Sequence, residues 1–223
     1  MSDDFTSEDF IWQLKNSKDP DERLYAAFKL GRDKQSYVIA PLVDASDDEE
    51  FTVRVRVAEA LGTREEVALV LPTLVTLIQD ENPIVRRTAA NSMGNVGSAD
   101  AVPYLCTALD DSDETVRSHA AEALGEIHTD ESAIALVSAF LHDSDYNVRY
   151  FAKQSLGKVG QAGVDAILAI VDETESPDLL IEICEILGNL ADSRSKPTLE
   201  TLADHENQDI AEMASWALKR IWD

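Results

Sequence analysis

The chain has 223 residues, of which 43 are acidic and 19 basic, so its net charge at pH 7 is −24. This charge repels phosphate backbones and anionic membrane surfaces, because nucleic-acid affinity comes first from Lys and Arg that displace counterions. We therefore expect no nucleic-acid partner and no membrane partner. Acidity of this kind is typical both of proteins that attract basic partners and of proteins from a high-salt habitat, and composition does not separate the two.

Targeting and cofactor signals are missing from the sequence. Residues 1–4 are polar or acidic after the initiator Met and lack an apolar segment, and no later stretch is apolar over the length of a membrane span. Cys106 and Cys184 lie far apart and belong to no CxxC pair, so neither a disulfide framework nor a zinc site is indicated. We expect a soluble, cytoplasmic protein with no cofactor and no structural metal.

The first helices in chain order are marked by their caps. Residues 6–16 are predicted to form the first helix, and Asp19 is a good N-cap for a second helix that Pro20 opens. The same N-cap position is occupied further along the chain by Asn82, Asp113, Asp145, Ser176 and Asn207. Between these caps lie shorter apolar runs that each contain a proline, namely Pro41, Pro72, Pro103 and Pro197. A proline at this place predicts the first turn of a helix or a kink in it.

A glycine recurs every 31 or 32 residues: Gly31, Gly62, Gly94, Gly125, Gly157 and Gly188, with Lys219 at the next expected place. Eight residues before it is a position that we call the arginine slot, occupied in order by Arg23, Arg54, Arg86, Arg117, Arg149, Leu180 and Ala211. Apolar residues precede the slot and follow it by seven and ten residues, which is the spacing of one helix face. The glycine is expected to be a notch into which a neighbouring helix packs.

A two-helix unit cannot bury its apolar face alone, so successive units must stack. We therefore predict an all-α fold, a right-handed α-α superhelix or solenoid of about seven two-helix repeats of 31–32 residues. Residues 1–223 are expected to form a single domain, since no linker interrupts the repeat.

The pattern D-x-x-x-x-V-R-x-x-A-A-x-x-L-G, best preserved at 111–125 and 80–94, resembles the short HEAT-like repeats of phycobilisome-linked proteins. These include bilin lyase subunits of the E/F type and phycobilisome-degradation factors. The resemblance covers essentially the whole chain, and it implies a structural ladder of Asp and Arg between repeats. Carried onto this sequence, the ladder pairs Asp48 with Arg54, Asp80 with Arg86, Asp111 with Arg117 and Asp143 with Arg149.

In solenoids of this kind the second helices line the concave side, and their non-core positions fall two, five and nine residues after the arginine slot. These positions mix aromatic, amide and charged side chains, which suits recognition of a protein surface. The residues predicted to bind a partner are Arg56, Asn91, Asn95, His119, Glu122, Phe151, Gln154, Lys158 and Trp216. The alternative, a solvated face with aromatic end caps, stays open because Tyr25, Phe28 and Trp216 lie in terminal repeats.

Enzymes of similar fold make different demands on the sequence. Deoxyhypusine hydroxylase resembles this fold and places His-Glu pairs directly after the repeated Arg, whereas here those positions hold no such pair. HEAT-like DNA glycosylases need a basic face, which an acidic chain does not supply. We predict no metal and no catalytic residue, and we favour a non-catalytic adaptor that holds a protein, most simply a phycobiliprotein. Two alternatives remain: a bilin lyase-like subunit, and a general HEAT-repeat adaptor unrelated to phycobilisomes.

Overall fold

The computed structural model describes residues 5–172 and 174–222, and every regular element in that part of the chain is helical. Contacts divide the chain into two compact units, Met1–Ala123 and Leu124–Asp223, which are described separately below. The expectation of a single domain over 1–223 therefore stays a prediction. Within the described residues, no helix is long and apolar enough to cross a membrane.

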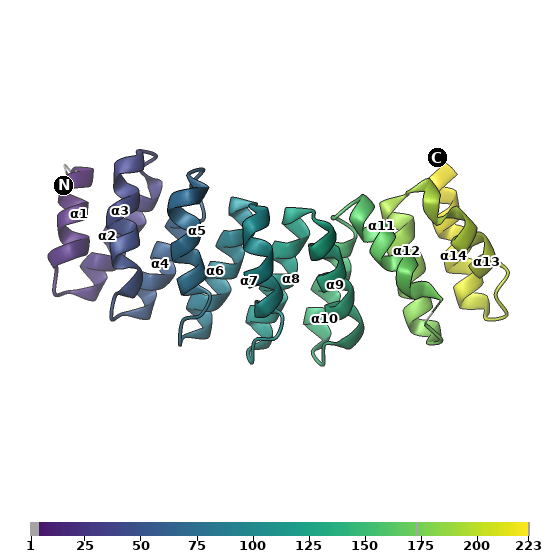
Figure 1. Ribbon diagram of the computed structural model, residues 1–223. Coiled ribbons are helices and arrows are strands. Elements are labelled where there is room, and N and C mark those ends of the chain that lie inside the picture. The colour runs from purple at the N-terminus through teal and green to yellow at the C-terminus, as the bar shows by residue number, and fades with distance from the viewer. Residues whose placement is uncertain (1–4, 173, 223) are drawn as a thin grey trace. The chain divides into compact units, whose positions relative to one another are not determined.

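The first unit alternates the first and second helices of successive repeats, with short 3-10 turns between some of them (Figure 1). Its elements are α1 (Ser7–Asn16), α2 (Pro20–Arg32), η1 (Ser36–Val38), α3 (Ile39–Asp44), η2 (Ala45–Asp47), α4 (Phe51–Leu61), α5 (Val67–Leu77), α6 (Pro83–Val96), η3 (Ala99–Ala101), α7 (Val102–Ala108) and α8 (Glu114–Ile127), which carries the boundary. Second helices α2, α4 and α6 pack on one another in sequence, and α3 packs on α1 and α5.

The second unit continues the same alternation. Its elements are α9 (Asp130–His142), α10 (Tyr146–Leu156), α11 (Gln161–Val171), α12 (Pro177–Leu190), η4 (Ser193–Ser195), α13 (Lys196–Ala203) and α14 (Gln208–Trp222). Helix α14 packs along α12, and α11 packs on both α9 and α12. Across the described residues the helices form seven pairs, so the α solenoid of two-helix repeats expected from the sequence is confirmed.

The second helices begin where their caps predict. The side chains of Asp19, Asn82 and Asp145 accept hydrogen bonds from backbone N–H groups in the first turns of α2, α6 and α10. Such a cap satisfies donors that have no partner inside the helix. Ser176 occupies the N-cap position of α12 without a side-chain bond, and Pro177 begins that helix. The local signals for helix starts therefore hold in both units.

The recurrent glycine is a packing notch in most repeats. A Cβ atom added to Gly31 would lie 2.9 Å from the Cβ of Ala60, and one added to Gly62 would lie 2.5 Å from that of Ser92. The same close approach recurs at Gly94, Gly125 and Gly188, which face Ala123, Ser155 and Ala217. The facing residue is always small and stands six residues after the next arginine slot. Glycine lets the two helix backbones approach, which is the role expected from the repeat.

Gly157 departs from this pattern. A Cβ added there meets the Gln154 carbonyl oxygen of its own helix, at 3.3 Å, and no atom of α12 within 4 Å. The residue of α12 at the facing position is Ile186, which is larger than the Ala or Ser of other repeats and is buried. A branched side chain keeps α12 away from the notch, so α10 and α12 pack less closely than α12 and α14.

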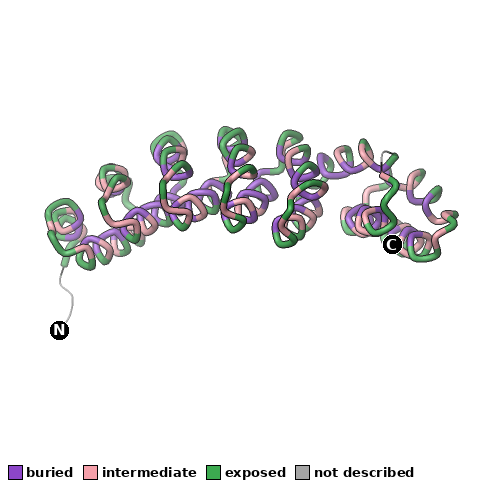
Figure 2. Tube along the Cα trace, turned by 90° about the horizontal axis from the view of Figure 1, so that it is seen from below, coloured by how far each residue is buried: buried purple, intermediate pink, exposed green. Residues whose placement is uncertain are grey.

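The buried residues follow the facing sides of the helix pairs within each unit (Figure 2). In α2 and α4 they include Ala26, Leu30, Val57 and Leu61, at the apolar positions of the repeat. The positions two, five and nine residues after the arginine slot remain largely outside this core. The fold therefore leaves one face of each second helix free to act as a surface.

Candidate protein-binding face

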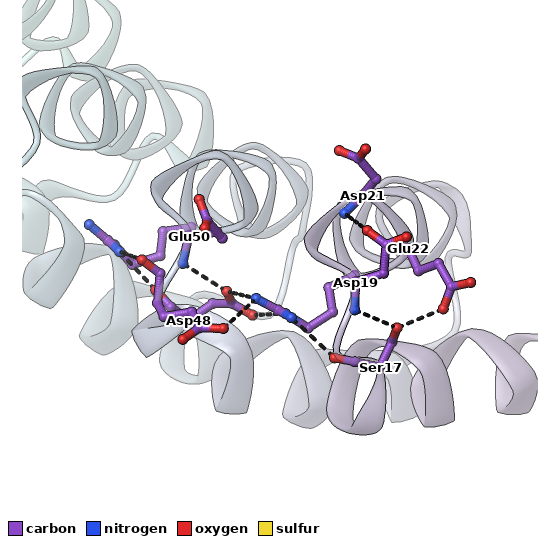
Figure 3. Close-up of polar contacts among 9 residues, drawn as sticks. Ser17, Asp19, Asp21, Glu22, Asp48 and Glu50 are labelled. Atoms are coloured by element: carbon purple, nitrogen blue, oxygen red, sulfur yellow. Dashed lines mark hydrogen bonds and ion pairs between the residues drawn. The ribbon is translucent and has the colours of Figure 1, made fainter.

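The arginine slots of the first unit lie between successive repeats. Arg23 donates from Nε and Nη2 to the two carboxylate oxygens of Asp48, at 2.7 and 2.9 Å (Figure 3). Arg54 binds Asp80 at 2.7 and 2.8 Å, and Arg86 binds Asp111 at the same two distances. These are bidentate ion pairs, the strongest geometry available to a guanidinium and a carboxylate.

A further N–H of each guanidinium reaches the loop that precedes its own helix. Arg54 donates from Nη1 to the carbonyl oxygen of Asp48 at 2.8 Å, and Arg86 donates to that of Asp80 at 2.8 Å. Asp48 therefore joins two arginines, Arg23 through its carboxylate and Arg54 through its backbone. Each Arg is tied to its own loop and to the Asp of the following repeat.

The pairing expected from the resemblance is thereby corrected. Asp48 with Arg54 and Asp80 with Arg86 are linked through the Asp carbonyl, whereas the carboxylates belong to Arg23 and Arg54. The carbonyl link also joins Asp111 to Arg117 and Asp143 to Arg149, each at 2.8 Å. Arg23 was left out of the expected ladder although it fills the first arginine slot. An Arg side chain is long enough to span to the next repeat, which the spacing within one repeat does not reveal.

The electrostatics of the ladder favour its charged form. Burial alone would raise the pKa of Asp80, but hydrogen bonds from Arg54 and from the Asn82 backbone N–H outweigh it, so the pKa is lowered. Asp111 has a lowered pKa for the same reasons, with Arg86 as its partner. In return, the hydrogen bond to Asp80 raises the pKa of Arg54. These arginines already hold carboxylates, so the row does not offer an open anion site.

The residues predicted to bind a partner lie outside the core in the first unit. Asn91 and Asn95 are exposed on α6, while Arg56 on α4 and His119 and Glu122 on α8 are half-buried. Arg56 forms an ion pair with Glu59, one turn along the same helix. A ring nitrogen of His119 is hydrogen bonded to the Thr115 carbonyl oxygen at 2.7 Å. These side chains share the outward side of the second helices.

One position of the expected outward stripe is buried. Thr88 stands two residues after the slot of Arg86, and its side chain lies inside the structure. The hydroxyl donates to the Ile84 carbonyl oxygen at 2.8 Å. A hydroxyl satisfied by its own helix can be buried at low cost, so this position does not contribute to a binding surface.

In the second unit, Phe151 on α10 is half-buried, and its ring packs edge-on against Tyr150 with centroids 5.5 Å apart. Gln154 and Lys158 are exposed, and Lys158 forms an ion pair with Glu126 at 2.6 Å. Each of these side chains lies where the helical phase predicts. Phe151 and its neighbour form an aromatic cluster at the surface of a repeat that has repeats on both sides in the sequence.

Trp216 on α14 has a different surrounding. A Cβ added to Gly188 would lie 2.7 Å from the Trp216 ring, so the indole covers that glycine, and the guanidinium of Arg220 lies over the ring at 5.1 Å from its centroid. Part of the indole is thus used within the fold, as the end-cap alternative expects.

The residues predicted from the sequence to bind a partner leave out a second cluster, around Phe28 on α2. The guanidinium carbons of Arg32 and Arg56 each lie 5.5 Å from the centroid of the Phe28 ring. Phe28 and Arg32 stand five and nine residues after the first arginine slot, so the same register that selected Arg56 could have selected them.

The cysteines do not present a reactive thiol pair. Cys184 is buried in α12, and burial raises the pKa of its thiol to about 11, so the thiol stays protonated at neutral pH. Cys106 is half-buried on α7. Over the part of the chain that the structure describes, no group of three His, Cys, Asp or Glu side chains is placed to hold a metal ion.

The repeat geometry agrees with a match to a known family. The sequence profile of HEAT repeats matches residues 7–80 and 71–157. The chain belongs to the HEAT-repeat family. Along almost its whole length it is also similar to phycocyanin operon protein Z of Pseudanabaena tenuis, at 28% identity over 216 residues, which cover 96% of this chain and 94% of that protein.

Over a shorter stretch, this HEAT-repeat chain is similar in sequence to the phycocyanobilin lyase subunit alpha of Synechococcus elongatus. The two are 35% identical over 106 residues, 44% of this chain and 38% of that protein. Among solved structures, the complex of CpcE and CpcF of phycocyanin lyase from Nostoc has a similar fold, with a TM-score of 0.61 and 22% identity over 97% of this chain and 87% of that one. The resemblance to HEAT-like proteins linked to phycobilisomes is confirmed by these similarities.

Proposed function

We propose that this chain is a non-catalytic scaffold that holds a phycobiliprotein on the concave face lined by its second helices, as a factor of the phycobilisome-degradation type would. The observation that carries the proposal is the placement of Arg56, Asn91, Asn95, His119, Glu122, Phe151, Gln154, Lys158 and Trp216, all of which lie outside the core. A merely solvated face would consist of Glu, Lys and Gln, whereas this face combines aromatic rings, amides and both charges.

The aromatic cluster on α10 supports a partner in the middle and late repeats. Tyr146 and Tyr150 are 67% and 45% exposed, and Phe151 is half-buried beside them. Apolar area left at the surface costs free energy unless a partner covers it, and covering one such ring contributes about 2–3 kcal/mol. Glu122 and Lys158 can pair with opposite charges of a partner and so orient it, which chiefly affects the rate of association and the specificity.

The choice of a phycobiliprotein rests on the relatives. Similarity to phycocyanin operon protein Z extends over 96% of this chain. The nine residues of the face named above include no Ser, Thr or Cys, and the buried Cys184 thiol is a poor nucleophile. These observations favour holding over chemistry.

The test is gel filtration of the purified chain mixed with phycocyanin, followed by titration of the complex. We expect a complex whose visible spectrum is that of phycocyanin alone, and at least tenfold weaker binding by Phe151→Ala. Ile134→Ala is the matched control, because Ile134 is 66% exposed on the first helix of the same repeat. If no complex forms, or if both variants weaken it equally, the proposal is wrong.

A second candidate is a bilin lyase-like subunit that attaches or detaches a phycobilin, favoured by the 35% identity to phycocyanobilin lyase subunit alpha. Free phycocyanobilin separates the two functions. A change in its absorbance on mixing with the chain supports the lyase-like subunit, whereas an unchanged spectrum with a stable phycocyanin complex supports the scaffold. If the chain binds neither free phycocyanobilin nor phycocyanin, a general HEAT-repeat adaptor is the function that is left.

A further inference from the structure

We propose that a cationic aromatic patch on α2 and α4, formed by Tyr25, Phe28, Lys29, Arg32 and Arg56, binds an acidic segment of a partner protein that carries an aromatic side chain. The proposal deepens the protein-binding role given above, because it names the chemistry of the partner at the first two repeats. It concerns a different part of the face from the Phe151 cluster.

The patch gathers three cations, Lys29, Arg32 and Arg56, on a chain whose net charge is −24. The chain has 43 acidic and 19 basic residues, and in this unit the ladder arginines Arg23, Arg54 and Arg86 each hold a carboxylate. Lys29 and Arg32 differ: among the residues that the structure describes, no carboxylate lies within ion-pair distance of either. Arg56 has Glu59 as its partner. Counted together with Glu59, the three cations of the patch leave a net charge of +2.

Aromatic rings hold these cations in place. The Lys29 ammonium lies 5.1 Å from the centroid of Tyr25, and the guanidiniums of Arg32 and Arg56 lie over Phe28. A guanidinium that rests on a ring by its flat face keeps N–H donors along its edge for a planar carboxylate. A ring contact of this kind restricts the arginine side chain before binding, so less side-chain entropy is left to lose.

Phe28 and Tyr25 have different ring contacts. Tyr25 packs edge-on against the buried Phe10, at 5.9 Å between centroids, and so covers the end of the core. Phe28 is 37% exposed, and the guanidiniums of Arg32 and Arg56 lie over its ring. An aromatic side chain of the partner can pack edge-on against the exposed part of this ring while neighbouring carboxylates bind the cations, which is the charge complementarity that selects an acidic partner.

The copolymer of Glu and Tyr is a defined probe with this chemistry, and it tests the patch without phycocyanin. We expect fluorescently labelled copolymer to bind the full chain at about 0.15 M salt, where the long-range repulsion by the net charge of the chain is screened, and to bind more tightly than poly-Glu. Phe28→Ala and Arg32→Glu should each weaken copolymer binding at least tenfold. Lys18→Glu is the matched control, because Lys18 is exposed in the same unit and the charge change is identical.

Three results would overturn the proposal: no binding of the copolymer at about 0.15 M salt, equal binding of poly-Glu, or equal losses in Lys18→Glu and Arg32→Glu. Circular dichroism of each variant shows whether it is folded, and Arg32→Glu changes an exposed side chain, so it keeps the test valid if Phe28→Ala melts. Sedimentation of the chain without probe detects self-association; a dimer dispersed by Arg32→Glu would mean that a second copy, and not another protein, occupies the patch.

Discussion

The two units join their repeats by different means. In the first unit, Arg23, Arg54 and Arg86 reach the Asp carboxylates of the following repeats. In the last two repeats of the second unit the same slot holds Leu180, which is buried, and Ala211. Apolar packing of similar volume is often as stable as a buried ion pair, so the ladder need not make the first unit more stable. A bidentate pair does accept only one geometry, and we infer that the ladder specifies the register between repeats.

One notch of the second unit, at Gly157, also differs from those of the first unit. Gly62 receives Ser92 closely, whereas Gly157 faces Ile186 and stays unfilled. The joint between α10 and α12 is bridged instead by Lys153, whose ammonium lies 2.7 Å from Glu185 and 3.8 Å from Glu182. The contact between α10 and α12 thus relies on a partly exposed ion pair. In the first unit, successive second helices are joined by close backbone contact and by buried ion pairs. Variants in both units can measure what each ion pair and each glycine notch contributes to stability.

The largest effect is expected when one partner of a buried pair is removed. Asp80→Ala leaves the guanidinium of Arg54 buried without its carboxylate, and the free energy of unfolding should fall by about 3–5 kcal/mol. Glu81→Ala is the control, because Glu81 lies 3.7 Å from the same Arg54 but its side chain is 89% exposed. Urea denaturation of both variants measures the difference. Equal losses would show that burial does not decide the strength of these pairs.

A methyl group added at the recurrent glycine should destabilise a repeat whose notch is in close contact with the next helix, and should have little effect where it is not. Gly62→Ala places a Cβ atom 2.5 Å from the Cβ of Ser92 and 2.8 Å from its Cα, so a helix must shift, at a cost of about 1–3 kcal/mol. Gly157→Ala meets only the Gln154 carbonyl oxygen at 3.3 Å and should change stability by about 0.5 kcal/mol or less. Thermal melting compares them directly. A large loss of stability in Gly157→Ala would contradict the open packing between α10 and α12.

Acid should weaken the ladder selectively. Because the pKa of Asp80 is lower in the folded chain than its ordinary value of 3.8, the unfolded chain binds more protons as the pH falls. The stabilisation is therefore complete above the ordinary pKa and is lost as the pH falls through the folded one. Asp80→Asn should show a shallower loss of stability below about pH 4 than the parent chain. Parallel acid-unfolding curves would contradict the assignment.

The parts of this structure that follow from short-range chemistry could be predicted from the sequence. Asp19 and Asn82 mark helix starts because their side chains bond the first turn, and Gly31 marks a notch because its spacing repeats. The direction of the ladder could not be read in this way, since every repeat contains both partners and only the fold shows which Asp an Arg reaches. Thr88 was placed outward by helical phase alone, although its hydroxyl can be satisfied by Ile84 and then buried.

The unfilled notch at Gly157 was hidden for a related reason: the glycine keeps its period, and the change lies in the facing residue, Ile186. That joint gives the smallest expected effect. Lys153→Ala removes an ion pair whose carboxylate side chain, Glu185, is 38% exposed, and stability should fall by about 0.5–1 kcal/mol at low salt. Salt screens a partly exposed pair, so the loss should shrink toward zero near 1 M NaCl, whereas the loss in Asp80→Ala should persist. Urea titrations of both variants at low and high salt measure this. If the Lys153→Ala loss does not depend on salt, the joint between α10 and α12 is held by packing of the lysine stem and not by its charge.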